Sequence, residues 1–301
     1  MDNDNTLKKL LAHTYKNLRF KLSYRNKTIK DGKVGNCEIT KMINSGIPFA
    51  IGRLGATESR CIDKWMSKKK FEQSNLENIK NLSGVFPNDI ESVAKFCEVY
   101  SNALAGLDAL TVWGVTGERK ILDRFCDNPT LLGIMSLEPY FYDEPWSFAL
   151  KNKKILIVHP FVQTIAKQLQ IKKELFRNPN VLPDFKQVCY VKAVQSLGGN
   201  SEFESWFEAL DYMKKQIAEQ DFDIAIIGAG AYALPLTVYV KSLGKQAIQL
   251  AGATQLLFGI RGKRWEDRPE YQSIFNEYWV YPAQNETPIN KDNVEGGSYW
   301  K

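Results

Sequence analysis

The sequence lacks the long apolar runs and the paired cysteines that mark several classes of protein. No apolar stretch in its 301 residues reaches the roughly 18 residues of a membrane-spanning helix. We expect no signal peptide, because lysines interrupt the first apolar positions, Leu7, Leu10 and Leu11. The five cysteines are odd in number and have no Cys-x-x-Cys spacing, the pattern of many metal sites. We therefore expect reduced thiols in a cytoplasmic protein.

A strong excess of charge of one sign is also missing. The chain has 40 Lys and Arg against 34 Asp and Glu, a net charge of +6, and we expect no nucleic-acid partner. Only the segment 8–33 is distinctly basic, with Asp31 as its one acidic residue. Two interpretations stay open for it: a solvated helical face, or a surface attracted to an anionic membrane or an acidic acceptor. The second would allow peripheral contact with the inner face of a membrane.

Short apolar runs alternate with helical patterns along the chain. Strands are predicted at 49–54, 109–113, 154–158, 187–193, 223–227 and 246–250. Helices are predicted at 7–22, 39–44, 75–106 with a break at 84–88, 201–220 and 235–243, with Asn88 or Asp89 as an N-cap. This alternation favours an α/β protein whose mostly parallel sheet is covered on both faces. We expect one Rossmann-like domain over 46–301, a helical extension over 1–45 and an irregular wrap from Trp265 onward.

The residues that follow each strand are the candidates for a site, because ligands bind at the carboxyl edge of such a sheet. These positions are rich in glycine and small hydroxyl residues, and five such junctions together predict a polar cleft. The candidates are Arg53, Gly55, Thr57, Glu58 and Ser59 after the first strand, Glu118 after the second, His159 after the third, Gly228, Gly230 and Tyr232 after the fifth, and Thr254 and Gln255 after the sixth.

The fifth junction, Ile227-Gly-Ala-Gly-Ala-Tyr-Ala, matches the Gly-x-Gly-x-x-Ala form of a dinucleotide fingerprint. Glycines there let the backbone approach a pyrophosphate at a helix amino end. The full fingerprint adds an acid about 20 residues later, but the next strand ends Ala247-Ile-Gln-Leu250 without a carboxylate. A phosphate or diphosphate cradle and a tight strand-to-helix turn both remain open. A nicotinamide- or flavin-linked oxidoreductase is less favoured than either.

Glu58 raises a separate question of charge. A carboxylate at a strand end that faces a diphosphate is repelled by the phosphates, unless a divalent cation lies between them or Arg53 and Arg60 neutralise it. An ion pair that merely shapes the turn is the alternative. The sequence alone leaves both interpretations open.

The segment Arg53-Leu-Gly-Ala-Thr-Glu58 resembles the Arg-Phe-Gly-Asp-x-Glu element of the bacterial GT-D-type glycosyltransferases, whose Asp-x-Glu motif serves metal and nucleotide-sugar binding. The blocks 223–235 and 243–248 are similar to that family's second half, and 252–265 and 294–300 resemble a subgroup found among polysaccharide-biosynthesis proteins. The resemblance runs from Phe49 to the end. It implies a GT-D-like domain over 46–301 that transfers a sugar, with inversion, from a nucleoside-diphosphate sugar to a cell-surface polysaccharide or glycoconjugate, a glycan or lipid-linked acceptor.

The resemblance also implies a divalent cation, Mn²⁺ or Mg²⁺, on Glu58. One departure matters, because Ala56 stands where the family has the first aspartate. A single carboxylate can still hold a cation through waters and phosphates. A non-catalytic relative that binds a nucleotide sugar or a glycan is therefore an alternative to the enzyme.

Glycosyl transfer needs stabilisation of the departing diphosphate, a base for the acceptor hydroxyl and exclusion of water. Two alternatives could stabilise the diphosphate. One is Glu58 with a metal, together with the glycine-rich turn, and the other is a mobile clamp formed by Arg261, Lys263 and Arg264 between flexible glycines. His159, one of two histidines, and Glu118 are equal candidates for the base. The sequence does not indicate the donor sugar, the acceptor or the oligomeric state.

Overall fold

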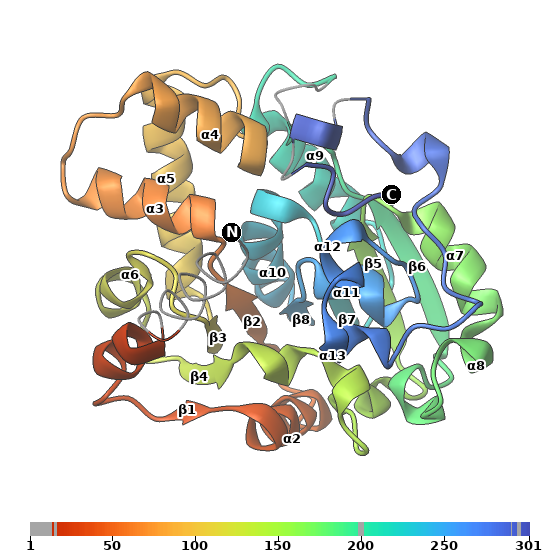
Figure 1. The fold of residues 1–301 in the computed structure, drawn as a ribbon. Helices are drawn as coiled ribbons and strands as arrows, with labels where there is room; N and C mark the ends of the chain where they lie inside the picture. The colour runs from red at the N-terminus through yellow and green to blue at the C-terminus, as the bar shows by residue number, and fades with distance from the viewer. Residues whose placement is uncertain (1–13, 15–16, 198–201, 290, 294–295) are drawn as a thin grey trace, which may run out of the picture.

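A computed structural model describes residues 14, 17–197, 202–289, 291–293 and 296–301 of the chain. Its centre is a single sheet of eight parallel strands in the order β1-β4-β3-β2-β8-β7-β5-β6 (Figure 1). The strands are β1 Ile29–Lys30, β2 Ala50–Arg53, β3 Ala109–Val112, β4 Thr130–Gly133, β5 Lys154–His159, β6 Gln187–Lys192, β7 Ile224–Ile227 and β8 Gln246–Gln249. The predicted α/β fold with a parallel sheet is confirmed.

Every predicted strand is present, and the sequence missed β1 and β4. β1 is only two residues long and lies at the sheet edge beside β4. β4, Thr-Leu-Leu-Gly, is too short to show a period of its own. Its parallel pairing with β3 places the residues after Gly133 at the carboxyl edge of the sheet.

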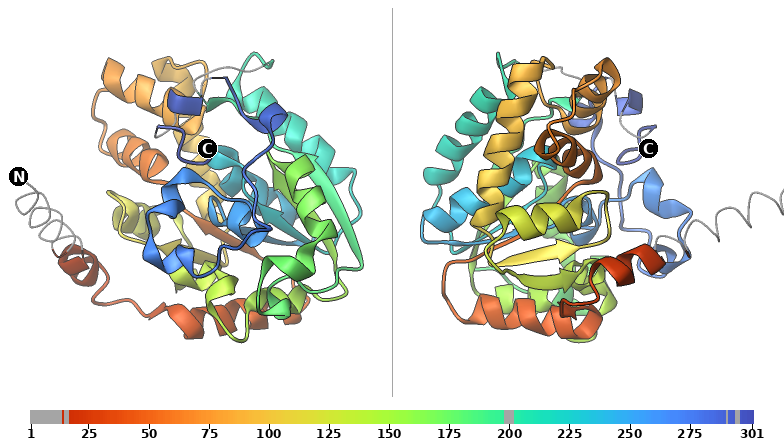
Figure 2. Two further views of the ribbon diagram at one scale, coloured as in Figure 1. Left: turned by 45° about the vertical axis from the view of Figure 1, so that its right-hand side comes forward. Right: turned by 90° about the vertical axis from the view of Figure 1, so that its left-hand side faces the viewer.

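Helices cover both faces of the sheet. The first layer consists of α3 Ala56–Met66, α4 Gln73–Ser83, α5 Ile90–Ala105, α6 Glu118–Phe125, α9 Trp206–Ala218 and α10 Ala233–Ser242. The second consists of α2 Gly32–Asn44, α7 Val162–Gln170, α8 Lys172–Leu175, α11 Ala253–Leu257, α12 Lys263–Glu266, α13 Pro269–Gln272 and the 3-10 turns η1 Ile134–Leu137, η2 Pro139–Phe141, η3 Trp146–Leu150 and η4 Pro179–Val181. In the right-hand view of Figure 2, the sheet lies between α5 above and α2 below.

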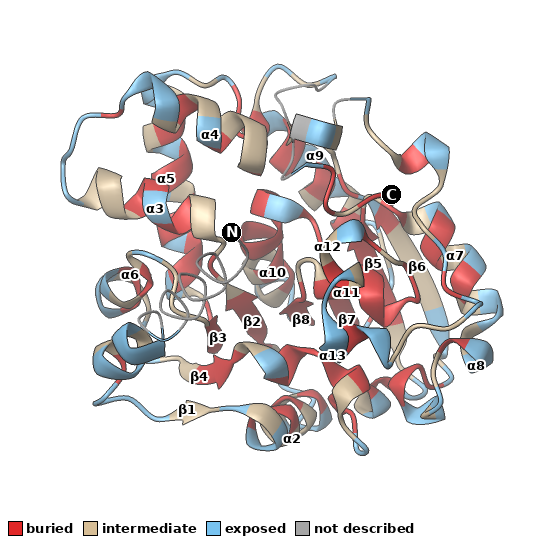
Figure 3. Ribbon diagram, viewed as in Figure 1, coloured by how far each residue is buried: buried red, intermediate tan, exposed pale blue. Residues whose placement is uncertain are grey.

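The protein has two hydrophobic cores, one on each face of the sheet, because the side chains of each strand point alternately to the two faces. Ala225 and Ile227 of β7 belong to the core under the first layer, whereas Ile224 and Ile226 belong to the core under the second. Successive side chains of a strand point to opposite faces, so a short strand buried on both sides is apolar throughout. Figure 3 shows the central strands as buried, the edge strands β1 and β6 as mostly intermediate, and much of the outer helix surface as exposed.

Several helices begin at other residues than the sequence predicted. The helix predicted at 39–44 begins at Gly32, because Asp31 accepts the Gly32 N–H as N-cap. The helix predicted at 201–220 begins only at Trp206, after the N-cap Ser205. The break within 75–106 is confirmed, with Asp89 as the N-cap of α5. Of the helix predicted at 7–22, residues 17–23 are helical and most of the rest lies outside the described residues.

β1 and α2 belong to the sheet and its second layer, so residues 29–44 pack with the rest of the domain. From Trp265 onward the described chain is irregular apart from short turns, among them η7 Gln284–Glu286 and η8 Lys291–Asn293. No helix in the described part is long and apolar enough to cross a membrane.

The path of the chain places one strand junction at the middle of the sheet. β2 and β8 are neighbours. The segment leaving β2 turns into α3 on one face, and the segment leaving β8 turns into α11 on the other. In open α/β sheets, ligands bind where such segments diverge at the carboxyl edge. We call this place the β2/β8 edge and assign to it Arg53 and the four residues whose charges act on it: Glu58, Glu138, Arg264 and Tyr299.

Candidate functional site

Glu58 is held at the start of α3 by the shape of the turn before it. Gly55 is the N-cap of α3, and Glu58 lies in the first turn, near the positive end of the helix dipole. A Cβ on Gly55 would lie 1.9 Å from Oε2 of Glu58, so a side chain there would displace this carboxylate. The carboxylate lies against Gly55, and the Glu58 residue is only 7% exposed. Burial raises the pKa of Glu58, although the charges of Arg53 and Arg60 act in the opposite direction.

Arg53 ends β2 with its guanidinium over an aromatic ring. Its backbone N–H donates to Oε1 of Gln249 at 2.9 Å, and its Cζ lies 4.9 Å from the centroid of Trp113. The Trp113 indole is itself fixed by a 2.9 Å bond to the carbonyl of Leu54. Within the described residues, the half-buried guanidinium has no hydrogen bond or ion pair. Burial lowers the pKa of Arg53, while the nearby Glu138 and Glu58 raise it.

Glu138 is a third charged group at this edge, and the sequence did not indicate it. It follows β4 through η1 and accepts hydrogen bonds from the hydroxyls of Tyr140 at 3.0 Å and Tyr271 at 2.9 Å. Burial raises its pKa, and the charge of Arg53 lowers it. Recognition of β4 from the sequence would have placed Glu138 just beyond the end of a strand, among the other candidates.

The three basic side chains of the run 261–264 lie in different surroundings. Arg261 pairs with Glu266 at 3.5 Å and lies over the rings of Phe275 and Tyr281 at 5.1 and 5.6 Å. Lys263 is exposed. Arg264 lies 4.8 Å from the centroid of Tyr299, and its charge lowers the pKa of Arg53.

The backbone of this run is tied to the C-terminal segment. Arg261 donates its N–H to the carbonyl of Val280 at 2.7 Å, and the N–H groups of Lys263 and Arg264 donate to residues 300 and 298 at 3.1 and 3.0 Å. A turn held by three backbone hydrogen bonds within four residues is a fixed element of the fold. The prediction of a flexible clamp therefore finds no support in these contacts.

Four predicted site residues face the interior. Ser59 donates to the carbonyl of Thr116 at 2.7 Å, and Gln255 donates to the carbonyls of Arg261 and Tyr299 at 3.0 and 3.3 Å. The hydroxyl of Tyr232 lies 2.6 Å from that of Ser196, and its ring stacks on Trp206 at 5.0 Å. Thr254 is fully buried. Thr57 is half-buried and lines a hollow of about 200 Å³ between α3 and α4.

The two glycines after β7 differ in their surroundings. A Cβ on Gly228 would lie 2.5 Å from Oγ1 of Thr254 and 2.6 Å from Cδ2 of His159. Gly230 has a φ of +54° and nothing within 4 Å of its Cβ position. The space beside Gly228 is thus filled by protein side chains, as in a tight strand-to-helix turn, whereas Gly230 serves the backbone conformation.

His159 is a poor candidate for a base in this arrangement. Its Nδ1 accepts the backbone N–H of Phe161 at 3.0 Å. The ring is buried, and burial lowers its pKa to about 3. A neutral imidazole whose Nδ1 accepts must carry its proton on Nε2, so it has no free lone pair at physiological pH.

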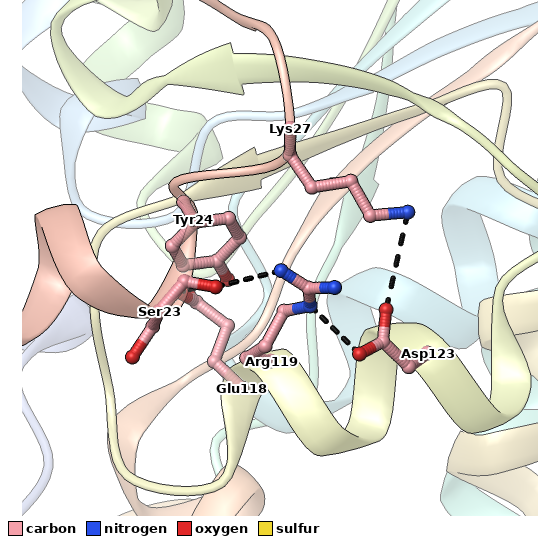
Figure 4. Close-up of polar contacts among 6 residues, drawn as sticks. All are labelled: Ser23, Tyr24, Lys27, Glu118, Arg119 and Asp123. Atoms are coloured by element: carbon pink, nitrogen blue, oxygen red, sulfur yellow. Dashed lines mark hydrogen bonds and ion pairs between the residues drawn. The ribbon is translucent and has the colours of Figure 1, made fainter.

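Glu118 closes a network at the start of α6 (Figure 4). Its buried carboxylate accepts the hydroxyl of Tyr24 at 2.9 Å and the N–H of Gly114 at 2.8 Å. Arg119 donates to the carbonyl of Ser23 at 2.6 Å and pairs with Asp123 at 2.7 Å. Burial raises the pKa of Glu118, and its hydrogen bonds lower it. These contacts fasten residues 23–27 onto the turn after β3, a structural role.

A second unpredicted carboxylate, Glu286 of η7, lies at the start of α7. It accepts the N–H groups of Gln163 and Thr164 at 2.7 and 3.1 Å, and the Thr164 hydroxyl. A helix amino end that follows a parallel strand often binds a phosphate. Here a side chain of the C-terminal segment occupies that position.

The residues present do not fit a divalent cation. Among the described residues, no group of three or more His, Cys, Asp or Glu side chains is placed to hold a metal ion. Glu58 is the only carboxylate of the Asp-x-Glu position, since Ala56 replaces the other. It also lies beside Arg53 and Arg60, whose charges repel a cation.

No family model matches the chain, and no curated protein is similar to it. Among solved structures, a selenomethionine-substituted domain described as "domain of unknown function 1792" is similar over 78% of this chain and 82% of its own, with 14% identity and a TM-score of 0.46. A likeness this distant carries no argument about function. The proposal below rests on the sequence motifs and on the geometry of the β2/β8 edge.

Proposed function

We propose that the chain is a glycosyltransferase that moves a sugar from a nucleoside-diphosphate sugar to a cell-surface polysaccharide or glycoconjugate. The resemblance of residues 53–58 to Arg-Phe-Gly-Asp-x-Glu supports the reaction class. The observation that carries the proposal is the half-buried guanidinium of Arg53 at the carboxyl edge, without an ion pair among the described residues. Such a cation is suited to an anionic ligand with oxygens in a plane, such as a diphosphate.

Arg53 and Glu58 take different parts in the proposed reaction. The acceptor hydroxyl attacks the anomeric carbon, and the bond from that carbon to the diphosphate oxygen breaks, with inversion. Arg53 compensates the negative charge that the leaving diphosphate gains. Glu58 takes the proton of the hydroxyl, because burial raises its pKa towards the range of an effective base.

Glu138 acts on the Arg53 guanidinium but takes no part in the reaction itself. The hydroxyls of Tyr140 and Tyr271 occupy its carboxylate, which leaves its charge to attract Arg53. The charges of Glu58 and Glu138 both act on Arg53, and its ring contact with Trp113 keeps the guanidinium in place before a donor binds. Preorganised charge of this kind costs little reorganisation during the reaction.

We also propose that transfer takes place in the cytoplasm, where a lipid-linked acceptor would lie at the inner face of the membrane. The five cysteines are free, in accord with a reducing compartment. Attraction of the basic segment 8–33 to anionic lipid would bring the enzyme to that surface. Residues 8–13 of this segment lie outside the described part of the chain.

Calorimetric titration with UDP, GDP, dTDP, CMP and NAD tests the donor class. We expect one nucleoside diphosphate to bind, and Arg53→Gln to weaken it about tenfold or more, the loss of roughly 1.4 kcal/mol or more of binding free energy. Arg124→Gln is the matched control, because Arg124 also lies over a ring, that of Phe125, but at the far end of α6. Binding of NAD alone would favour the oxidoreductase and sink the proposal.

Turnover separates the enzyme from the non-catalytic relative. The release of nucleoside diphosphate from a donor sugar, in the presence of membrane acceptor, is the measurement. We expect Glu58→Gln to bind the nucleotide normally but to lose about 100-fold or more in rate, the usual effect of losing a general base. Wild-type protein that binds a nucleotide sugar but never transfers it would establish the non-catalytic relative.

A further inference from the structure

Two cysteine thiols meet in the core under the first helix layer. Sγ of Cys61 in α3 lies 3.6 Å from Sγ of Cys97 in α5, and the two helices pack against each other (Figure 1). All five cysteines are free, and within the described part of the chain this is the only contact between two thiols. The sulfur atoms of a disulfide are about 2.05 Å apart. The two thiols therefore need to approach by only about 1.5 Å to bond.

The two thiols differ in their access to solvent. Cys97 is fully buried, whereas Cys61 is 8% exposed and lines the hollow of about 200 Å³ between α3 and α4. A hollow of about 15 Å³ is enough to hold one water molecule, and hydrogen peroxide is little larger than water. Cys61 is therefore the thiol of the pair that a small dissolved oxidant meets first.

The surroundings of the pair assign a different role to each thiol. Arg60 and Lys64 line the same hollow as Cys61, and cations beside a cysteine favour its thiolate form. Lys64 also pairs at 3.4 Å with Glu72, which is exposed. The hydrogen bond with Cys61 and burial raise the pKa of Cys97, so Cys97 stays a thiol. Cys61 is then the nucleophile, and Cys97 is the thiol that resolves its oxidised form.

We propose that Cys61 and Cys97 are a modification site at which hydrogen peroxide forms a disulfide between α3 and α5. The Cys61 thiolate attacks one peroxide oxygen, and the O–O bond breaks to give a sulfenic acid and hydroxide, which takes a proton to become water. The sulfur of Cys97 then attacks the sulfenic sulfur, its proton leaves, and hydroxide departs to become a second water. The two thiols lose two electrons and the peroxide gains them, so no other reactant is needed.

The disulfide would lie on the helix that carries a residue of the β2/β8 edge. Cys61 comes three residues after Glu58 in α3, so the two side chains share one face of the helix, about one turn apart. An added bond at Cys61 constrains α3 next to Glu58. The inference does not depend on the proposed function, but it places an oxidant-sensitive bond on the helix of the proposed base. A transient disulfide that senses an oxidant is the usual kind in a reducing compartment.

Peptide mapping by mass spectrometry, without reductant, tests the site in the full chain after treatment with hydrogen peroxide. We expect a linked peptide that joins residues 61 and 97, and its disappearance after dithiothreitol. Cys37, Cys126 and Cys189 are more exposed and contact no other thiol in the described structure, so they are the internal control. The triple variant with serine at these three positions should lose both remaining thiols to peroxide and regain both with dithiothreitol.

Cys97→Ala separates the two roles. Without the resolving thiol, Cys61 should stop at the sulfenic acid, which dimedone traps as an adduct at residue 61. Absence of the linked peptide from the wild type, under conditions that oxidise the three control cysteines, would overturn the site. A link from residue 61 or 97 to another cysteine that is as abundant as the link between them would also overturn it. A folded Cys97→Ala protein without an adduct at residue 61 would overturn the role of Cys61 as the nucleophile.

Discussion

Replacement of Gly228 by alanine tests whether the glycine-rich turn after β7 is shaped by packing or by a ligand. The new Cβ would lie 2.5 Å from Oγ1 of Thr254, 2.6 Å from Cδ2 of His159 and 2.8 Å from Cβ of Thr254. Neither neighbour can retreat easily. Thr254 is fully buried in α11, and the His159 ring is fixed by the N–H of Phe161.

Inserting a methyl group into a packed site costs about 1–3 kcal/mol. Because three contacts are too short and all three atoms belong to fixed groups, we expect Gly228→Ala to cost about 3 kcal/mol, the upper end of that range. At roughly 2 °C per kcal/mol for a chain of this size, the melting temperature should fall by about 6 °C. Thermal unfolding followed by circular dichroism is the assay.

Gly230→Ala is the control for the backbone. Its φ of +54° strains an alanine, but nothing lies within 4 Å, so we expect a loss of about 1 kcal/mol from strain alone. The double variant Gly228→Ala with Thr254→Ala should lose less than the sum of its parts, because the second change removes the closest atom. A Gly228→Ala protein that melts with the wild type, or an additive double variant, would refute the packing explanation.

Three buried carboxylates give further predictions. Glu118→Ala should cost about 3 kcal/mol in urea unfolding, because the hydroxyl of Tyr24 and a backbone N–H lose a buried acceptor; an unchanged midpoint would contradict this. Glu286→Gln should speed amide exchange at residue 164, since an amide is a weaker acceptor than a carboxylate for the Thr164 N–H and hydroxyl; equal exchange would show that the C-terminal segment does not protect α7. Burial raises the pKa of Glu138, so the folded state holds this proton to higher pH than the unfolded state does, and stability falls as pH rises above about 4.3. Glu138→Gln should flatten this fall in urea titrations, and an unaltered slope would refute the assignment.

The sequence predicted the sheet well because each long strand is a separate apolar run. Gly228 follows Ile224–Ile227 and His159 ends Lys154–His159, and the ends of both strands were found within two residues. β4 was missed since four residues show no period. That omission also concealed Glu138, whose place at the carboxyl edge depends on β4.

Roles within the site were harder to predict than positions. Glu118 follows β3, and His159 is the last residue of β5. Glu118, however, bonds the turn after its own strand, and His159 bonds the N–H two residues later. A linear pattern does not say whether a side chain turns outward or back to its own backbone. Glu286 acts on Thr164, 122 residues away, and no local signal could have indicated that contact.

A substitution at position 56 tests how an added negative charge at the β2/β8 edge changes diphosphate binding. Ala56 is the first residue of α3, so Ala56→Asp adds a carboxylate at the positive end of the helix and restores the Asp-x-Glu order with Glu58. We expect slightly higher stability, by about 0.5 kcal/mol, from the helix dipole. In EDTA the same change should weaken diphosphate binding, because the new charge competes for Arg53 and repels phosphate.

Mn²⁺ should restore the affinity of Ala56→Asp, since two carboxylates and the phosphates then provide a site for the cation. Titration with pyrophosphate, with and without Mn²⁺, measures this switch, and Ala56→Asn is the neutral control. If Ala56→Asp binds in EDTA as the wild type does, residue 56 does not face the diphosphate. The loss of an aspartate would then explain nothing about metal use.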